Sequence, residues 1–253
     1  MRKEVNIEGN RHLETLANCD GYYECPKNAN GQRLGPLVGY AGKYQGLNSV
    51  YLQWVGDIYA NFSKAEIHPR VLRFFATCLI GRINQSIGLD QFDAFCGAPI
   101  GGYSLADLMG AVFDDVQVIK AEKKVVALAS PTSREKSELI FARHGVEKSQ
   151  RFVIVEDVCN NFSTTADLIK LIMASGGVVA GIACFLNRSL TVDDWYTVVD
   201  GAPPWNIPVV SLVRKPINEW RQDDPAVKED IAKGNVVWKP KDEWGRLKKA
   251  MQV

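Results

Sequence analysis

Hydrophobic positions along the chain fall into short apolar runs that alternate with segments of helical spacing. Apolar runs of four to eight residues bounded by turn residues indicate buried strands, whereas apolar residues at every third or fourth position indicate amphipathic helices. Their alternation is typical of a mostly parallel sheet with helices on both faces, so the pattern predicts an α/β fold. The predicted strands cover residues 50–55, 92–96, 116–119, 125–128, 151–155, 178–186 and 209–213, and the predicted helices cover residues 68–79, 104–112 (capped by Ser104), 133–143 and 164–173.

The two ends of the chain differ from its middle in amino-acid composition and pattern. Residues 21–46 are rich in Gly, Tyr, Asn and Pro without a sustained period, which indicates loops and short strands in a small lobe. In the tail, Trp238 and Trp244 stand among lysines, a pattern that favours a solvated helix anchored by its tryptophans over a nucleic-acid surface. We therefore expect an N-terminal region in residues 1–47, a core in residues 48–215 and a C-terminal extension in residues 216–253.

Composition excludes several classes of protein. Of 253 residues, 46% are hydrophobic and 23% are charged, which argues against disorder, collagen and a coiled coil. Thirty basic and 29 acidic residues give a net charge of +1, so no broad basic field predicts a nucleic-acid partner. No apolar stretch reaches the ~18 residues of a membrane span, and the first residues lack the apolar region of a signal peptide. Six scattered cysteines argue against a disulfide framework or a zinc site, and we expect a cytoplasmic protein.

A pair of acids and a hydroxyl-rich loop follow the apolar strand at residues 151–155. Glu156 and Asp157 are followed by Asn-Asn-Phe-Ser-Thr-Thr at residues 160–165, where a helix is predicted to begin. Ligands bind at the carboxyl ends of parallel strands, and N–H groups at a helix N-terminus bind anions. Acid pairs also occur at residues 114–115, 193–194 and 223–224, so an exposed acidic turn is the alternative, but only this pair has the strand before it and the hydroxyl loop after it.

This stretch resembles the phosphoribosyl-diphosphate (PRPP) motif of type I phosphoribosyltransferases. That motif is an apolar strand, two acids, an aliphatic residue and a Thr-, Gly- and Ser-rich loop leading into a helix. Residues 97–106, 118–124 and 181–188 are similar, in the same order, to the diphosphate loop, the start of the basic catalytic loop and the base-binding strand of the family, most closely of its orotate phosphoribosyltransferases. The resemblance covers roughly residues 48–213.

The resemblance implies a fold and an activity. The fold would be a mostly parallel sheet flanked by helices, with residues 1–47 forming a small hood. The activity would transfer 5-phosphoribosyl from PRPP to an orotate-like nucleobase and would release diphosphate. Mg²⁺ would be bound largely by diphosphate and ribose oxygens, so no residue is assigned as a direct metal ligand. The family also implies a homodimer.

The resemblance further implies roles for individual residues. The acids after the strand would hold the ribose hydroxyls, and the following loop would cradle the 5′-phosphate. An arginine would pair with an acidic substituent of the base. The resemblance places PRPP on Glu156, Asp157, Asn160, Asn161, Ser163 and Thr164, diphosphate on Ala98, Pro99 and Gly101, the base on Arg188, Asn160 and Lys43, and the catalytic steps on Asp157, Lys120 and Lys124.

Several positions depart from the family pattern, among them Asn160 and Asn161, where the loop has Thr and then Thr or Ala. Phe162 stands where the loop has Gly, so its side chain must point outward, or the loop has another shape, or PRPP binding is weakened. Asn161 could supply the left-handed backbone instead. Ala121 replaces a lysine of the basic loop, and Asn187 replaces the Asp before Arg188. These departures favour an alternative, a PRPP-fold ligand-binding or regulatory protein without turnover. A purine-type transferase is a third reading, which would leave Arg188 without a carboxylate to bind.

Overall fold

A computed structural model describes residues 11–46, 50–114, 116–127, 136–199 and 204–252, and in these residues the chain packs as two compact units. One unit is formed by Ala65–Pro216. The other combines the N-terminal part of the chain, up to Lys64, with the C-terminal part from Ile217. Residues 50–64 thus pack with the N-terminal region rather than with the core, and the expected hood and C-terminal extension belong to one unit.

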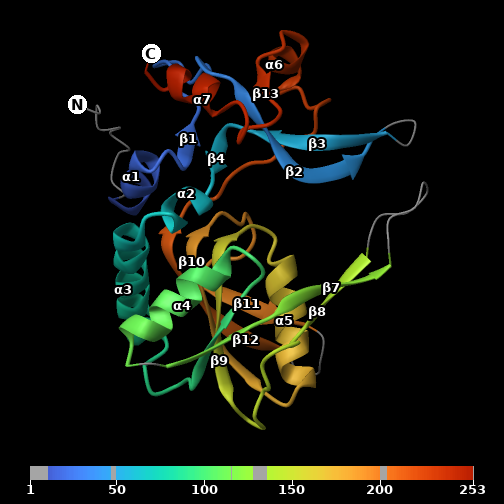
Figure 1. Cartoon of the computed structure of the whole chain (residues 1–253). Helices are drawn as coiled ribbons and strands as arrows, with labels where there is room; N and C mark the ends of the chain where they lie inside the picture. The colour runs from blue at the N-terminus through green and yellow to red at the C-terminus, as the bar shows by residue number, and fades with distance from the viewer. Residues whose placement is uncertain (1–10, 47–49, 115, 128–135, 200–203, 253) are drawn as a thin grey trace. The chain divides into compact units, whose positions relative to one another are not determined.

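The Ala65–Pro216 unit is built on a sheet that has six strands in the described part of the chain (Figure 1). The strand order is β11-β12-β10-β9-β5-β6, and every neighbouring pair is parallel except β11 with β12, so β11 is an antiparallel edge strand. The predicted mostly parallel sheet is confirmed. The strands are β5 (Ala94–Gly97), β6 (Gln117–Lys120), β9 (Arg151–Cys159), β10 (Val178–Asn187), β11 (Trp195–Val198) and β12 (Trp205–Arg214).

Helices cover both faces of this sheet. Helices α3 (Pro69–Ser86) and α4 (Gly102–Val112) pack together on one face, where Phe75 of α3 meets Phe185 of β10 with ring centroids 4.5 Å apart. Helix α5 (Ser163–Ala174) covers the other face, and its buried residues share a core with alternate residues of β9 and β10. Side chains of a strand alternate between faces, so an almost wholly apolar strand such as β10 fits a position between two helical layers.

Two local predictions in this unit were wrong. Residues 136–140 form strand β8 (Lys136–Ile140) rather than a helix, because they pair antiparallel with β7 (Glu122–Ala127) and set Glu138 opposite Lys124. Cross-strand pairing of opposite charges stabilises a strand, and such tertiary partners override helix-forming composition. Helix α4 begins at Gly102 with Gly101 at its N-cap position, so Ser104 lies within the first turn and is not the cap. Residues 128 and 133–135 lie outside the described residues.

The second unit contains the two ends of the chain. Strands β2 (Leu37–Gln45) and β3 (Tyr51–Gly56) form an antiparallel hairpin, and β13 (Val236–Val237) from the C-terminal part pairs parallel with β2. The tail predicted as one solvated helix therefore holds two short helices and a strand, because the strand's backbone groups are satisfied by β2. The remaining elements are α1 (Arg11–Asn18), β1 (Tyr22–Glu24), β4 (Ile58–Ala60), α2 (Ser63–Glu66, which spans the boundary of the two units), α6 (Lys228–Ala232) and α7 (Trp244–Ala250).

Among the residues that the structure describes, no helix combines the length and the apolar character needed to cross a bilayer.

Candidate functional site

The two acids of the motif lie inside β9, which continues to Cys159 rather than ending before them. Glu156 is only 7% exposed, and Asp157 is half-buried. Consecutive strand residues point to opposite faces of the sheet, so the two carboxyl groups lie in different surroundings. Glu156 faces a cavity of about 200 Å³, whose lining is residues 156 and 158–165. The cavity therefore joins a buried carboxyl group to the loop at the start of α5.

Burial raises the pKa of Glu156 well above the ordinary value of a glutamate. The neighbouring Asp157 acts in the same direction, while the N–H of Asp157, which donates to Oε1 of Glu156 at 3.2 Å, lowers the pKa. Desolvation of the charged form is the largest cause. The carboxyl group that lines the cavity is thus biased toward its neutral form, which reduces its repulsion of an anion bound in the same place.

Glu156→Gln should flatten the pH dependence of stability. Between the ordinary carboxyl pKa of about 4.3 and the raised pKa of Glu156, the folded protein holds a proton that the unfolded chain has released. The free energy of unfolding therefore falls as pH rises through this window. Glutamine stays neutral, so the variant should lose less stability than the wild type between about pH 5 and pH 8. Denaturant titrations at each pH measure the free energy of unfolding, with replacement of the exposed Asp167 by Asn as the control. The prediction would be contradicted if the free energy of unfolding changed with pH equally in the wild type and in Glu156→Gln.

The loop before α5 keeps a compact turn although it lacks the glycine of the family. Phe162, at the N-cap position of α5, has φ 57° and ψ 20°, which is left-handed backbone. Its side chain is 2% exposed and belongs to the core under α5. Of the three alternatives for Phe162, the outward-pointing side chain is therefore excluded, and the left-handed backbone lies at Phe162 rather than at Asn161. Burial of the large ring is favourable and offsets the strain of this conformation.

The loop gathers most of the residues that were assigned to the sugar phosphate. Asn160, Asn161, Ser163 and Thr164 all line the cavity that Glu156 lines. Oδ1 of Asn161 accepts a hydrogen bond from the N–H of Ser163 at 3.1 Å, which closes the turn at the start of the helix. N–H groups at such a helix start favour an anion. Sequence reasoning did not include Thr165, a buried cavity residue whose only sequence signal was its place in the hydroxyl run.

Asp157 lies against the loop that was assigned to diphosphate. A Cβ atom added at Gly101 would overlap the carboxyl group of Asp157, so this carboxyl group sits directly on the Gly101 backbone. Oδ1 of Asp157 accepts the N–H of Val158 at 2.8 Å, and the N–H of Ala98 donates to the carbonyl of Val155 at 2.9 Å. The structure thus brings together the second acid of the motif and the loop of Ala98, Pro99 and Gly101.

Glu66 is an acid of this neighbourhood that sequence reasoning missed. Burial raises its pKa, the nearby charge of Asp157 raises it further, and a hydrogen bond with Ser104 lowers it. Glu66 therefore lies beside Asp157 and the first turn of α4. It is an isolated acid just before a predicted helix, and no signal in the sequence links it to the motif.

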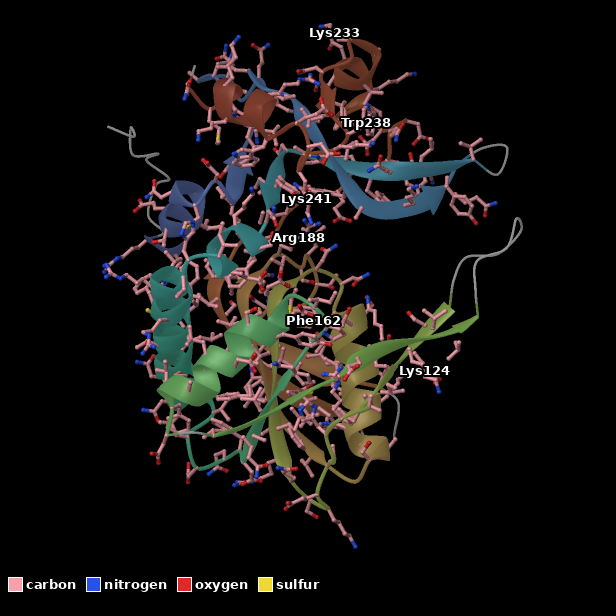
Figure 2. The ribbon with its side chains drawn as sticks, viewed as in Figure 1. Lys124, Phe162, Arg188, Lys233, Trp238 and Lys241 are labelled. Atoms are coloured by element: carbon pink, nitrogen blue, oxygen red, sulfur yellow. The ribbon has the colours of Figure 1, made fainter. Side chains whose placement is uncertain are left out.

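The two lysines assigned to catalysis have different surroundings. Nζ of Lys120 lies 2.6 Å from Oδ2 of Asp107 and 5.7 Å from the ring centroid of Tyr103. The hydroxyl of Tyr103 donates to the carbonyl of Ala121, which ties α4 to the end of β6. Lys124 is exposed on the β7–β8 hairpin, and Figure 2 shows it well apart from Phe162 and Arg188. The structure therefore does not bring Lys124 to the cavity.

Arg188 is held beside the loop by its own backbone. Its N–H donates to the carbonyl of Cys159 at 2.9 Å, and its side chain is largely buried, with the residue 9% exposed. The buried Asn187 before it donates from Nδ2 to the carbonyls of Val192 and Asp193 at 3.1 and 3.2 Å. An aspartate could not donate these bonds in its charged form, so asparagine at this position suits the turn that follows β10.

Lys43, assigned to the base, lies in the other unit. It is an exposed residue of β2, where it pairs in register with Gln53 of β3. Its role stays a prediction.

Comparisons with known proteins give the family context. No protein-family model matches the chain. An orotate phosphoribosyltransferase from Caldanaerobacter subterraneus subsp. tengcongensis is 23% identical over 133 residues, which are 51% of this chain and 65% of that protein. A hypoxanthine/guanine phosphoribosyltransferase from Methanotorris igneus is 27% identical over 127 residues, 48% of this chain and 66% of that protein. The matches thus span just under two thirds of each relative's length.

A solved structure of an adenine phosphoribosyltransferase from Trypanosoma brucei superposes with a TM-score of 0.50 at 15% identity, covering 83% of this chain and 82% of that one. The relatives and the structural neighbour are phosphoribosyltransferases, which confirms the resemblance inferred from the PRPP motif. The chain therefore has the type I phosphoribosyltransferase fold, and in sequence it resembles orotate and purine phosphoribosyltransferases.

Proposed function

We propose that this chain transfers a 5-phosphoribosyl group from PRPP to a nucleobase and releases diphosphate. The observation that carries the proposal is the cavity of about 200 Å³ where Glu156 meets the loop at the start of α5, with Asp157 on the adjoining Gly101 turn. The structural neighbour from Trypanosoma brucei was solved with AMP, pyrophosphate and ribose-5-phosphate, and AMP and pyrophosphate are the products of such a transfer to adenine.

The chemistry of the transfer fits these surroundings. Displacement of diphosphate from the anomeric carbon creates positive charge on the ribose and a departing polyanion, so the reaction needs carboxylates near the ribose and cations or N–H donors near diphosphate. Asp157 would face the ribose, and the loop around Gly101 would lie on the diphosphate side. Lys120 would neutralise diphosphate charge after leaving Asp107, its partner at 2.6 Å.

A magnesium ion is proposed as part of the substrate complex. In the described residues, no group of three or more acid, histidine or cysteine side chains is placed to hold a metal ion. The carboxylates of Asp157 and Glu66 lie near each other and offer the oxygen ligands that Mg²⁺ prefers. The residues therefore fit an ion held largely by diphosphate and ribose oxygens, with Asp157 beside it. When bound, the ion would neutralise charge on diphosphate.

A diphosphate-release assay tests the proposed activity. Protein, Mg²⁺ and PRPP are mixed with orotate, uracil, adenine, hypoxanthine and guanine in turn, and released diphosphate is measured. Release that depends on one base is the expected result. Binding of PRPP without release for any base would favour the second candidate, a ligand-binding or regulatory protein. That candidate is favoured by Ala121 at a lysine position and by Lys124 lying apart from the cavity.

We further propose that the base carries an acidic group, as orotate does, and that Arg188 recognises it. Support comes from the backbone of Arg188, which is hydrogen-bonded to Cys159 next to the loop, and from the orotate enzyme among the relatives. A homodimer also remains part of the proposal, and sedimentation velocity tests it.

Arg188→Ala should weaken binding of the base and leave PRPP binding unchanged. A charge-assisted, bidentate hydrogen bond contributes about 1.5–3 kcal/mol, so the Kd of orotate should rise by about 10- to 100-fold. Calorimetric titrations with each ligand separately measure this split. Arg188→Lys, which keeps the charge but loses the planar fork, should recover only part of the loss. An equal loss for both ligands would show that Arg188 supports the structure of the loop instead.

A further inference from the structure

The loop that is proposed to hold the 5′-phosphate contains a residue in an unfavourable conformation. Phe162 has φ 57°, a region where the Cβ atom of a bulky L-residue crowds the backbone. Such a residue keeps this conformation only when its surroundings hold it there. A glycine would need no such support, so the chain must supply an anchor at this position.

The anchor is the core beneath the loop and an aromatic ring from the edge of the sheet. Phe162 is packed in the core that α5 shares with β9 and β10. Its ring stacks on the ring of Tyr196, with centroids 5.6 Å apart and planes inclined by 24°. Tyr196 belongs to β11, where it pairs with Ile207 of β12. The loop is therefore tied to a strand that hydrogen-bonds directly to the rest of the sheet.

Tyr196 can act on the loop without touching a ligand in it. The described residues that line the cavity run from Glu156 to Thr165 and do not include Tyr196. Asn161 and Ser163, which flank Phe162, are exposed cavity residues. A shift of the Phe162 ring would therefore move the backbone N–H groups on both sides of it.

We propose that Tyr196 is a positioning residue for the sugar phosphate, and that its stack on Phe162 holds the loop of residues 160–163 in the shape that binds phosphate. In this chain the aromatic stack does what the backbone freedom of glycine does in the family motif. The inference rests on the proposed function, because the ligand is the phosphate of PRPP.

Titration with ribose 5-phosphate tests the inference. Tyr196→Leu keeps an apolar side chain in the core but removes the stacked ring. An aromatic pair is worth a factor of about 3 to 10 in an equilibrium constant, so the Kd of ribose 5-phosphate should rise by about that factor. Tyr196→Phe keeps the ring and should bind as the wild type does. Binding of the base, whose acidic group is proposed to be recognised by Arg188, should fall by less than binding of ribose 5-phosphate in every variant that weakens phosphate binding.

Two further variants show whether Tyr196 acts through the Phe162 ring. Trp195→Ala removes the exposed neighbouring ring on β11, and it should leave phosphate binding unchanged. Phe162→Gly removes the ring on which Tyr196 acts and supplies a backbone that needs no anchor, so adding Tyr196→Leu to Phe162→Gly should weaken phosphate binding no further. Thermal melts establish that each variant is folded.

The outcomes separate the inference from the function on which it rests. If the wild type binds neither ribose 5-phosphate nor PRPP, the proposed function fails and the inference fails with it. If the wild type binds and Tyr196→Leu binds equally well, the function stands and the positioning role of Tyr196 is overturned. A further loss of binding when Tyr196→Leu is added to Phe162→Gly would overturn it too, because Tyr196 would then act without the Phe162 ring.

Discussion

Gly102→Ala is expected to destabilise the Ala65–Pro216 unit by about 3 kcal/mol or more, at the upper end of the cost of overpacking. A Cβ atom at this position would overlap the carbonyl oxygen of Val155 and lie 3.2 Å from Cα of Glu156. Both neighbours are backbone atoms of β9, so no flexible side chain can move aside. Helix α4 would have to shift away from the strand, and Gly101 would move with it relative to Asp157. Denaturant unfolding measures the loss.

Gly81→Ala is the matched control for this substitution. Gly81 lies in α3 of the same unit, and a Cβ atom added there meets nothing within 4 Å. Alanine in an open helix interior should stabilise the unit by about 0.5–1 kcal/mol. The two glycine-to-alanine changes should therefore have opposite signs. A small effect of Gly102→Ala, close to that of the control, would mean that α4 does not pack on β9 as closely as described.

Asp157→Asn is expected to weaken PRPP binding by about 10- to 100-fold, the equivalent of the 1.5–3 kcal/mol of hydrogen bonds to a charged group. The carboxylate lies against the Gly101 turn and is proposed to face the ribose, and asparagine replaces one acceptor oxygen with a donor and removes the charge. Oδ1 of asparagine can still accept the N–H of Val158, so the strand should keep its local structure. Titration with PRPP and Mg²⁺ measures the change.

Asp167→Asn is the control for this loss of charge. Asp167 is exposed on α5 in the same unit, so its replacement should change neither PRPP binding nor the melting temperature by much. The role of Asp157 would be refuted by unchanged PRPP binding in a folded variant. A large fall in the melting temperature of Asp157→Asn would instead point to a structural role for the carboxylate.

The predicted strands and helices of the core were mostly confirmed because their signals are local. The apolar run of β10 and the helical spacing of α3 and α5 each depend on a few neighbouring residues. The prediction of a helix at residues 133–143 was wrong because the observed structure depends on a non-local contact. Strand β8 depends on its pairing with β7, and a partner strand is not visible in the composition of the segment itself.

The residues of the candidate site likewise include some that the sequence predicted and some that only the structure revealed. The order of Glu156, Asp157 and the following loop predicted that they would lie together, because they are adjacent in sequence at the end of one strand. Glu66 could not be foreseen, since it reaches Asp157 only after α2 and β9 have been placed. The contact of Lys120 with Asp107 likewise depends on the packing of α4 beside β6.

The sequence by itself determined the α/β architecture of the core, the acids of β9 and the start of α5 after the polar run, because the hydrophobic period acts over a few residues. Only the tertiary structure decided that Phe162 turns into the core in a left-handed conformation and that its ring stacks on Tyr196. It also decided that the two ends of the chain share one unit. These features depend on contacts between residues far apart in the chain, which are formed only when the packed core satisfies both partners at once.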